Sequence, residues 1–571
     1  MNPKTYFSNF AQRFDLSRAT IRADLVAGLT VSLVVIPQSL AYAQLAGVPA
    51  YYGLYAALIP TVIGALFGSS NQLSTGPAAM TSLLTAASIS PLAELGSDLF
   101  YSYAILLALV AGIFQIMFGL LRIGALINFL SNPVLIGFIN AAAVIIGLSQ
   151  LPILLGIPSE HTKHFMLDTA QVISHLDSVH LLSFGFGVTA IFMLLGFKKF
   201  APKLPGILMT VAILTLLSYA IGYESMGGKV VGTVPQGLPP LSIPPLDWYA
   251  IAALAPAGLV IALISFMEAM SSCKVIAIRT RQPWDENKEL IGQGLAKIGA
   301  AFSQSIPVSG SFSRSALNLA SDAKTPLSSI FAAIFVLLTL MFFTSLLYSL
   351  PKSVLAAIIM MAVINLVNFQ AVKNAWRASR DDGLAVTLTF FSTLAFAPYI
   401  QNGILAGIIL SLSLLLYRMM RPRVSILGLH SDTTLRDAVR HKLPKLHPKL
   451  GVIRFDGDLR FMNVSYFENA LLKLERENPE LEYILVQSSG INGIDASGIA
   501  MLRNLHSRFA DTGIRLGFSS LKLQVSIVMD RTGLTRNIGE ANIFSTDRVA
   551  IDEIRRRLDG KGNDASNPVQ D

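Results

Sequence analysis

The sequence predicts a polytopic α-helical membrane protein followed by a small soluble α/β domain, and three observations support this fold class. Hydrophobic residues make up 53% of the 571 residues and charged residues only 14%, whereas a typical soluble protein is about 25% charged. Apolar segments follow one another from about residue 25 to about residue 418, each near the ~20 residues that span a bilayer. The composition becomes polar at 418–423, and strand-like and helix-like patterns then alternate.

Residues 1–24 are polar and basic, and no short apolar core with a small-residue cleavage site follows. We therefore expect a cytoplasmic N-terminal segment, not a signal peptide.

The transmembrane domain is expected at 25–420. Its clear apolar segments are 101–121, 123–153, 181–197, 205–222, 248–278, 326–350, 383–399 and 402–417. Shorter segments broken by Gly or Pro are 52–67, 76–90, 288–304, 311–320 and 353–367, and with 25–46 they make about fourteen.

The charges of the loops predict the orientation. One set of alternate loops is basic and carries Arg122, Lys198, Lys199, Lys203, Arg279, Arg281, Lys288, Lys373, Arg377 and Arg380. By the positive-inside rule this side faces the cytoplasm, which places both termini there in a multi-pass protein of the inner (plasma) membrane. The net charge of +9 is spread over these short clusters, so no nucleic-acid partner is expected.

The metal-ligating residue types give no clear metal site. The single Cys273 excludes an intramolecular disulfide and a cysteine cage. His161, His164, His175 and His180 fall in one outer loop, and we interpret them as solvated histidines because cysteines and tight spacing are missing. Neither a metal nor a cofactor is predicted.

Two interrupted segments, 73–80 and 306–315, indicate the substrate site. Each places Gly, Pro and hydroxyl residues directly before a short apolar helix. Broken backbone inside a membrane is tolerated where it is buried in protein or lines a wet cavity, and paired broken segments in the two halves of a transporter indicate a midplane site. Helix N-termini at such a site favour an anion. The candidate ligands are Thr75, Gly76, Ala78, Ser309, Gly310, Ser311, Phe312, Ser313 and Arg314. The alternative is that these residues are loop ends or small-residue helix contacts.

Glu268 lies in an otherwise uncharged apolar run. A carboxylate in the bilayer is expensive and suggests function, so Glu268 is the candidate for the coupling cation, either a proton or sodium. A structural hydrogen bond to a neighbouring helix is the alternative. Arg314 is either a fixed positive charge near the anion or a structural partner of a carboxylate. Gln38 and Tyr42 follow Pro37 at i and i+4 spacing, so they share one helix face that lines the same cavity or makes interhelical hydrogen bonds.

The C-terminal part divides into a polar linker at 421–448, a soluble α/β domain at 449–558 and a disordered tail at 559–571. Short apolar runs at 452–455, 483–487 and 516–519 are predicted strands. Segments 464–475 and 498–509 have the apolar spacing of helices.

Several of these segments, in the right order, resemble the SulP family of anion permeases. The resemblance is carried by "IPQSLAYAQLAGVPAYYGLYAALIP" (36–60), "STGPAAM" (74–80), "SFMEAMSSCKVIA" (265–277), "NKELIGQGLAKIGAAF" (287–302) and "PVSGSFSRSALN" (307–318). It implies a seven-plus-seven inverted repeat with core and gate domains, an anion between the third and tenth half-helices, a C-terminal STAS domain and a homodimer, with STAS as a possible contact. Lys297 departs from the family, in which Asn is frequent at this position, and it alters coupling or extends to the membrane interface.

"GINGIDASGIAML" (490–502) is similar to the STAS loop whose serine is phosphorylated in related bacterial proteins. This implies possible phosphorylation of Ser497. The helix-start chemistry alone favours the alternative that Asp495 and Ser497 cap the helix.

The leading functional hypothesis is a secondary active transporter of a small inorganic anion, sulfate by proton symport, with its site between half-helices that start near residues 76 and 311. The P-loop motif of ATP-driven pumps is absent, and no nucleophile–base arrangement of an enzyme is found within the spans. The alternatives are a sodium-coupled bicarbonate symporter, a dicarboxylate (fumarate or succinate) transporter, an anion channel, and a membrane sensor signalling through STAS.

Overall fold

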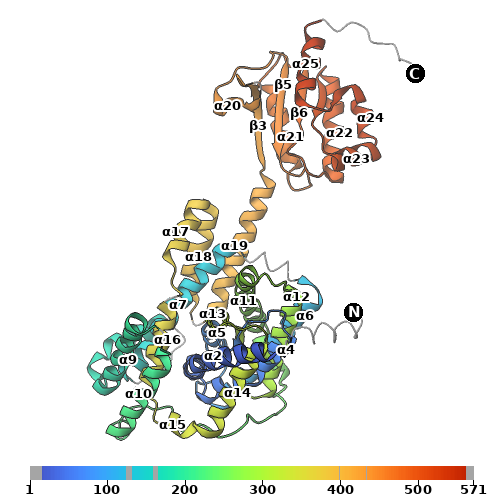
Figure 1. The fold of residues 1–571 in the computed structure, drawn as a ribbon. Coiled ribbons are helices and arrows are strands. Elements are labelled where there is room, and N and C mark those ends of the chain that lie inside the picture. The colour runs from blue at the N-terminus through green and yellow to red at the C-terminus, as the bar shows by residue number, and fades with distance from the viewer. Residues whose placement is uncertain are drawn as a thin grey trace. The chain divides into compact units, whose positions relative to one another are not determined.

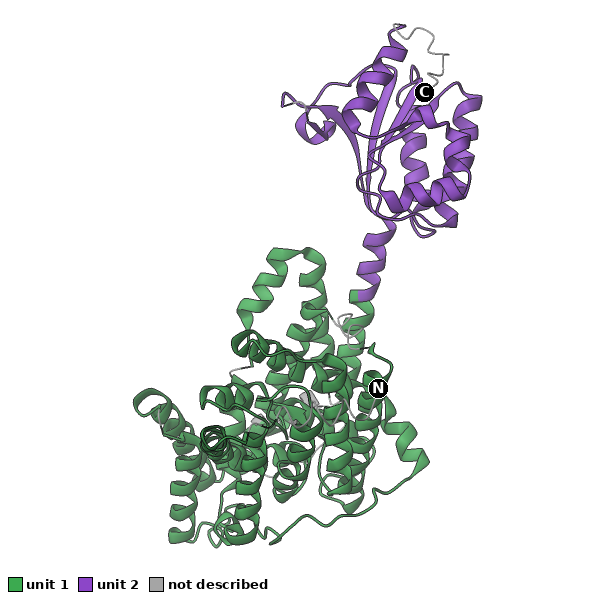
Figure 2. Cartoon of the chain, turned by 45° about the vertical axis from the view of Figure 1, so that its right-hand side comes forward, with its two compact units in different colours: residues 1–411 green, residues 412–571 purple. Residues whose placement is uncertain are grey.

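The computed structural model describes residues 14, 16–123, 131–157, 165–202, 204–364, 366–397, 399–432 and 434–560. The chain forms two compact units, Met1–Ser411 and Leu412–Asp571 (Figure 2). Most of the expected segments 1–24 and 559–571, and with them His161, His164 and Lys203, lie outside the described residues.

The first unit consists of helices and two very short strands (Figure 1). Its first half contains α2 (Arg18–Leu45), α3 (Tyr51–Ala56), α4 (Ile59–Phe67), β1 (Thr75–Gly76), α5 (Ala79–Ile89), α6 (Asp98–Leu120), α7 (Asn132–Leu155), α8 (Phe165–Ser174), α9 (Leu181–Phe200) and α10 (Gly206–Ile221). Its second half contains α11 (Trp248–Thr280), α12 (Glu286–Phe302), β2 (Ser309–Gly310), α13 (Phe312–Ala320), α14 (Leu327–Phe342), α15 (Thr344–Tyr348), α16 (Lys352–Ile364), α17 (Phe369–Ala378), α18 (Arg380–Phe396) and α19 (Ile400–Met420).

Each apolar segment of the sequence coincides with one or two of these helices. Among the described residues, seven stretches are helical, long and apolar enough to cross a membrane, and further apolar helices are shorter. The predicted segment 326–350 divides into α14 and α15, and the segment 123–153 is helical from Asn132. The polytopic α-helical fold is thus confirmed. The additional helix α17 was not predicted, because its apolar positions are interspersed with Lys373 and Arg377.

Helix packing repeats between the two halves. The first helix of each half packs along the fourth segment of the other half, α2 on α14 and α11 on α6. The second segments, α4 and α12, pack on each other, and so do the fifth segments, α7 and α16. This exchange between halves is the pattern of the predicted inverted repeat. Helices α2–α6 and α11–α14 form the core, and helices α7–α10 and α16–α19 form the gate.

Small residues bring the core helices together. A Cβ atom on Gly112 of α6 would lie 2.9 Å from the carbonyl oxygen of Gly294 on α12, and a Cβ on Gly294 would lie 2.8 Å from the carbonyl oxygen of Gly112. Glycines that face each other allow close backbone approach inside a membrane. The polar side chains on these two helices therefore lie within hydrogen-bonding reach of one another.

The second unit contains a six-stranded sheet of order β4-β3-β5-β6-β7-β8 (Figure 1). Its elements are β3 (Arg423–Leu429), β4 (Leu435–Asp437), α20 (Ala438–His441), β5 (Leu450–Asp456), α21 (Val464–Arg476), β6 (Tyr483–Gln487), α22 (Ala496–Asp511), β7 (Arg515–Ser519), α23 (Leu523–Arg531), α24 (Leu534–Ile538), β8 (Ile543–Phe544) and α25 (Asp547–Leu558). Strands β5 to β8 are parallel. The three predicted strands and the two predicted helices of this domain are confirmed.

Helices cover both faces of this sheet. Along β6, Ile484 and Val486 pack into the cluster that contains residues of α21 to α24, whereas Tyr483 and Leu485 pack into the cluster that contains α25. Successive side chains of a strand point to opposite faces. A parallel strand covered on both sides is apolar along its whole length, which is why 483–487 was identified from the sequence.

The prediction that 421–448 is a polar linker is wrong, because this segment contains β3 and β4. β3 pairs antiparallel with β5, from Arg423 opposite Asp456 to Ile426 opposite Ile453. Arg423 also forms an ion pair with Asp437 at 2.8 Å. The backbone amide of Arg440 and the Arg423 guanidinium lower the pKa of Asp437 to about 2. The strand was missed because its residues are apolar only in part and polar residues flank it.

Candidate anion site at two half-helix ends

The two interrupted segments meet in the first unit. β1 pairs antiparallel with β2, so that Thr75 lies opposite Gly310 and Gly76 opposite Ser309. On either side of this pair, the Ser311 amide donates to the Ser74 carbonyl at 2.9 Å and the Ser74 amide donates to Ser315 Oγ at 2.9 Å. Segments more than two hundred residues apart are thereby joined through their backbones.

A half-helix begins directly after each short strand. Ala78 is the N-cap of α5 and Ser311 the N-cap of α13, and neither side chain accepts a capping hydrogen bond. The first intrahelical bonds come from the Ser82 and Ser315 amides. The preceding first-turn amides of both helices have no carbonyl partner within the helix, and they offer donors to an anion.

Arg314 lies between the two half-helix starts. Its side chain is buried, with 1% of the residue exposed, and Nη1 donates to the Pro77 carbonyl at 2.8 Å. A Cβ atom on Gly76 would lie 3.1 Å from Nη2. Among the described residues, Nε and Nη2 have no hydrogen-bond partner. A buried charge is costly unless it is paired, so this guanidinium is suited to receive an anionic ligand.

Glu268 approaches the same site from α11. Ser309 Oγ, in β2, donates to Glu268 Oε2 at 2.7 Å and lies 3.2 Å from the Ser265 carbonyl oxygen. The carboxylate also interacts electrostatically with Arg314 and Lys297. A carboxylate, a guanidinium and an ammonium thus share one polar region in the core.

Gln38 and Tyr42 lie on α2, which packs against both α5 and α13. Both side chains are buried, and Gln38 Oε1 has no partner among the described residues. Tyr42 interacts electrostatically with Arg314 and Glu268. The structure therefore brings this helix face to the same region as the half-helices.

The start of α13 is more open than the rest of the site. Phe312 is 54% exposed, Ser313 is also exposed, and Ser311 is half-buried. The hydroxyl oxygens of Ser311 and Ser313 lie 3.5 Å apart. Protein therefore does not cover this helix end at Phe312 and Ser313.

Sequence reasoning missed the polar side chains that hold β1 in place. Gln293 on α12 is fully buried and donates to Thr75 Oγ1 at 2.7 Å and to Glu289 Oε1 at 3.0 Å. Thr61 Oγ1 donates to the Thr75 carbonyl at 2.8 Å. In the sequence, Gln293 is an uncharged amide within a segment of small residues, and this pattern is too common to indicate a site.

Lys297 is fully buried on α12, and its Nζ donates to Gln115 Oε1 on α6 at 2.6 Å. The interpretation that Lys297 extends to the membrane interface is therefore wrong. This departure from the family pattern places a cation in the core within electrostatic range of Glu268.

The remaining sequence candidates lie elsewhere. Asp495 caps α22 by accepting from the Gly498 amide at 2.9 Å, whereas Ser497 is exposed and makes no cap. His180 Nδ1 lies 2.8 Å from Ser183 Oγ, and Nε2 lies 3.0 Å from the Met226 carbonyl oxygen. In the part of the chain that the structure describes, no three His, Cys, Asp or Glu residues converge on a metal position.

Comparisons with known proteins agree with this architecture. The profile of the Sulfate permease family matches residues 21–389 and that of the STAS domain matches residues 443–550. The chain is 33% identical over 542 residues to "Probable sulfate transporter 4.2" of Arabidopsis thaliana, which covers 92% of this chain and 79% of that protein. It is 30% identical over 545 residues to a "Probable sulfate transporter" of Mycobacterium tuberculosis, which covers 95% of this chain and 97% of that protein.

Solved structures show the same fold. The anion transporter murine Solute Carrier 26 family member A9, solved in the inward-facing state, matches with a TM-score of 0.87 at 19% identity and covers 96% of this chain and 93% of its own. The transmembrane domain of a cyanobacterial bicarbonate transporter, BicA, matches with a TM-score of 0.59 at 24% identity and covers 69% of this chain and 98% of its own.

Proposed function

The chain belongs to the Sulfate permease family and carries a STAS domain, and we propose that it is a secondary active transporter that carries sulfate together with protons. Membership makes it a multi-pass membrane transporter of anions. The positive-inside pattern of its loops supports a place in the inner (plasma) membrane with both termini in the cytoplasm.

One observation carries the proposed site: two half-helix starts are joined by the β1–β2 pair, and the unpaired N–H groups of Arg314 lie between them. A tetrahedral dianion accepts hydrogen bonds in several directions, which fits donors that converge from two helices and one guanidinium. The Ser311 and Ser313 hydroxyls supply further donors at the open end of α13.

Sulfate is favoured because the relatives that match most of this chain are named as sulfate transporters. The likeness to a bicarbonate transporter is restricted to the fold. A divalent anion also gains more than a monovalent one from two positive helix ends and a buried cation.

Glu268 is the proposed proton site. When ionised, its carboxylate competes with sulfate for the field of Arg314, with which it interacts. Protonation removes that competing charge, so proton binding strengthens sulfate binding. By linkage, sulfate binding strengthens proton binding to the same extent. Two ligands that promote each other's binding are carried together, which is the requirement of symport.

The test is uptake of radiolabelled sulfate by proteoliposomes under an imposed inward proton gradient and, separately, an inward sodium gradient. We expect concentrative uptake with the proton gradient alone. Uptake that only sodium drives would overturn proton coupling. If the same vesicles transport bicarbonate or fumarate but not sulfate, the proposal that sulfate is the substrate would be overturned.

A further inference from the structure

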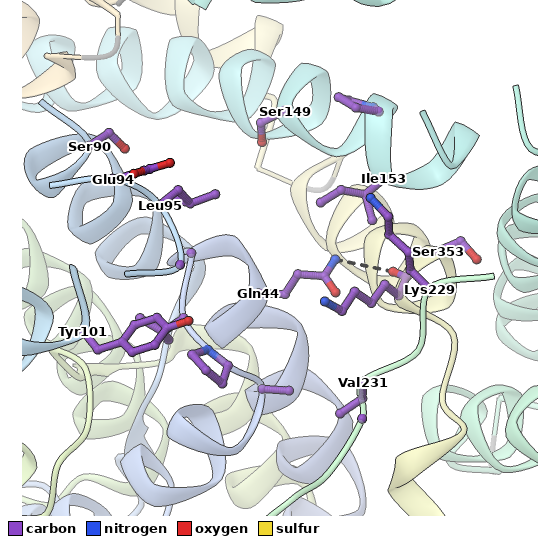
Figure 3. A pocket seen from close by; sticks show the side chains of 18 of the residues that line it. Gln44, Ser90, Glu94, Leu95, Tyr101, Ser149, Ile153, Lys229, Val231 and Ser353 are labelled. Carbon is purple, nitrogen blue, oxygen red and sulfur yellow. Dashed lines mark hydrogen bonds between the residues drawn. The ribbon is translucent and has the colours of Figure 1, made fainter. Parts of the chain in front are cut away.

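A large cavity lies between the core and the gate (Figure 3). Its volume is about 1200 Å³. The core contributes the end of α2, the start of α3, the α5–α6 connection and Tyr101, and the gate contributes parts of α7 and α9, the α10–α11 connection and the start of α16. The residues proposed to bind sulfate in the centre are not among its lining residues, so the cavity is a separate space.

The cavity opens on one face of the membrane domain. It is lined by the connections that lead into α3, α6, α9, α11, α16 and α19. These helices are even-numbered among the spanning segments, and connections into even-numbered segments lie on a common face. The loop charges assign this face to the outside.

Two lysines are fixed side by side in the gate wall. The Lys352 amide donates to the Lys229 carbonyl at 2.9 Å, and an antiparallel bridge joins Val230 to Pro351. The two ammonium groups repel each other electrostatically. Neither lysine forms an ion pair with any residue within the described ranges. Because their backbones are bonded, the two side chains start from neighbouring positions in the cavity wall.

Further polar groups of the lining lack partners. Ser353, 2% exposed, follows Lys352, and its Oγ has no hydrogen-bond partner among the described residues. Gln44 Nε2 donates to the Lys352 carbonyl at 3.4 Å, while Gln44 Oε1 has no partner within the described part of the chain. The charged residues among the described lining are Lys229, Lys352 and Glu94. The formal charge of the lining is therefore +1.

The cavity lies close to the central site along α2. Gln44 lines the cavity, and Tyr42, two residues earlier, belongs to the central site. The two residues are about 3 Å apart along the helix axis, but at i and i+2 they point to different faces of α2. Ala43, which lies between them, is completely buried, so the cavity does not continue into the central site at this point.

We propose that this cavity is a capture site in which Lys229, Lys352 and Ser353 bind the divalent oxyanion before it reaches the half-helices. A dianion between two ammonium groups relieves their mutual repulsion and satisfies the free hydroxyl. A positive cleft also raises the local concentration of anions and their rate of association. This inference rests on sulfate transport for its substrate, but the binding itself can be measured without transport.

Binding is tested by chemical protection on the full-length protein in proteoliposomes. A membrane-impermeant amine-reactive reagent is applied with sulfate or with gluconate at matched ionic strength, and labelling of each lysine is read by peptide mass spectrometry. Proteoliposomes hold the protein in both orientations, so the reagent reaches Lys229 and Lys352 in one population and the exposed Lys442 of the STAS domain in the other. We expect sulfate to slow labelling of Lys229 and Lys352 severalfold, with Lys442 unaffected. Equal labelling in both salts would overturn the proposal. The experiment is repeated in phosphatidylcholine vesicles with and without phosphatidylglycerol, which distinguishes free sulfate from a lipid phosphate. Protection that depends on the anionic lipid and not on sulfate would also contradict the proposal.

Transport gives a second and independent readout. In intact cells, K229Q/K352Q is expected to raise the KM for sulfate roughly tenfold with kcat retained, while K229R/K352R stays near the unchanged protein. E94Q removes the opposing charge and should lower KM. An unchanged KM in the double Gln variant, or equal changes in both double variants, would sink the capture site. Protection that persists in vesicles without sulfate flux would leave capture standing while the proposed transport function fails.

Discussion

At the scale of single residues, the central site is defined by charges that the protein leaves incompletely paired. Arg314 gives one N–H to a backbone carbonyl and retains two groups without partners among the described residues. Glu268 is fixed by one serine hydroxyl. A structural ion pair would satisfy both groups with each other. Their incomplete pairing is the feature that suits ligands which enter and leave.

The first prediction concerns Glu268. E268Q keeps the shape of the side chain and its bond to Ser309 but cannot exchange a proton. We expect sulfate–sulfate exchange to continue and accumulation driven by a proton gradient to be lost. The measurement compares counterflow with gradient-driven uptake in the same vesicles.

The matched control is E224Q, because Glu224 is an exposed carboxylate whose hydrogen-bond partner is the hydroxyl of Tyr348. It should accumulate sulfate like the unchanged protein. Accumulation by E268Q with its pH dependence intact would make Glu268 a structural residue.

The second prediction separates charge from geometry at Arg314. R314Q removes the guanidinium, and a hydrogen bond to a charged group contributes about 1.5–3 kcal/mol. We therefore expect sulfate affinity to fall at least about tenfold, as measured by equilibrium binding to the purified protein. R314K keeps the charge without the planar fork, so its sulfate affinity should lie between those of the unchanged protein and R314Q. Equal affinity in all three proteins would move the site elsewhere.

The charged residues of the site and the hydroxyl residues of the interrupted segments stand out in the sequence, whereas the glutamines that hold them in place do not. Glu268 and Arg314 stand out because a charge within an apolar run is expensive. Gln293 and Gln115 carry no such signal, and their importance depends on partners from helices far along the chain. Lys229 and Lys352 lie in separate loops, so only the folded backbone shows that they are neighbours.

At the scale of elements, the site depends on two strands of two residues each. Strands this short have no periodicity to detect, so the sequence indicated the two interrupted segments but not their pairing. The spanning helices were predictable because apolar length alone identifies them. β3 has no such apolar length and was missed, because its seven residues are apolar only in part and follow a helix end that contains arginine.

The third prediction tests this pairing at Gly310. A Cβ atom there would lie 2.9 Å from Ala269 Cβ and 3.0 Å from Ala269 Cα on α11. G310A should push β2 from α11 and cost about 1–3 kcal/mol of stability, as overpacking does. We expect a lower melting temperature together with weaker sulfate binding.

Gly185 provides the comparison, because a Cβ there would meet nothing within 4 Å. G185A should bind sulfate normally. Normal binding and stability in G310A would show that the strand pair is not needed for the site.

At the scale of the whole molecule, the membrane unit and the STAS domain are separate bodies with separate cores. The groups proposed to bind sulfate and the proton all lie in the first body. The inverted repeat uses the two halves of that body equally, since each supplies one half-helix. We therefore propose a role in assembly or regulation for the second body; the family resemblance implies a homodimer.

The fourth prediction follows from this separation. A chain that ends after Arg421 lacks the entire sheet, whereas a chain that ends at residue 440 keeps β3 and β4 without their partner β5. We expect the first truncation to lower yield and, if STAS mediates the dimer, to change the mass measured by light scattering from that of two truncated chains to that of one. The second should aggregate, because its strand edge is unpaired.

Both truncated proteins should keep the preference for sulfate over bicarbonate and fumarate in competition assays. A changed preference would give the STAS domain a part in substrate selection.

The pairing of β1 with β2 also has a consequence for biosynthesis. The first half of the chain enters the membrane while β2 has not yet been translated, so the backbone groups of β1 lack their partners in an environment that penalises unpaired polar groups. The ribosome must add more than two hundred residues before Ser309 and Gly310 arrive to complete the bonds. Until then the nascent protein depends on water, lipid headgroups or the insertion machinery to accommodate β1, and substitutions at this strand pair should appear first as degraded protein in the cell.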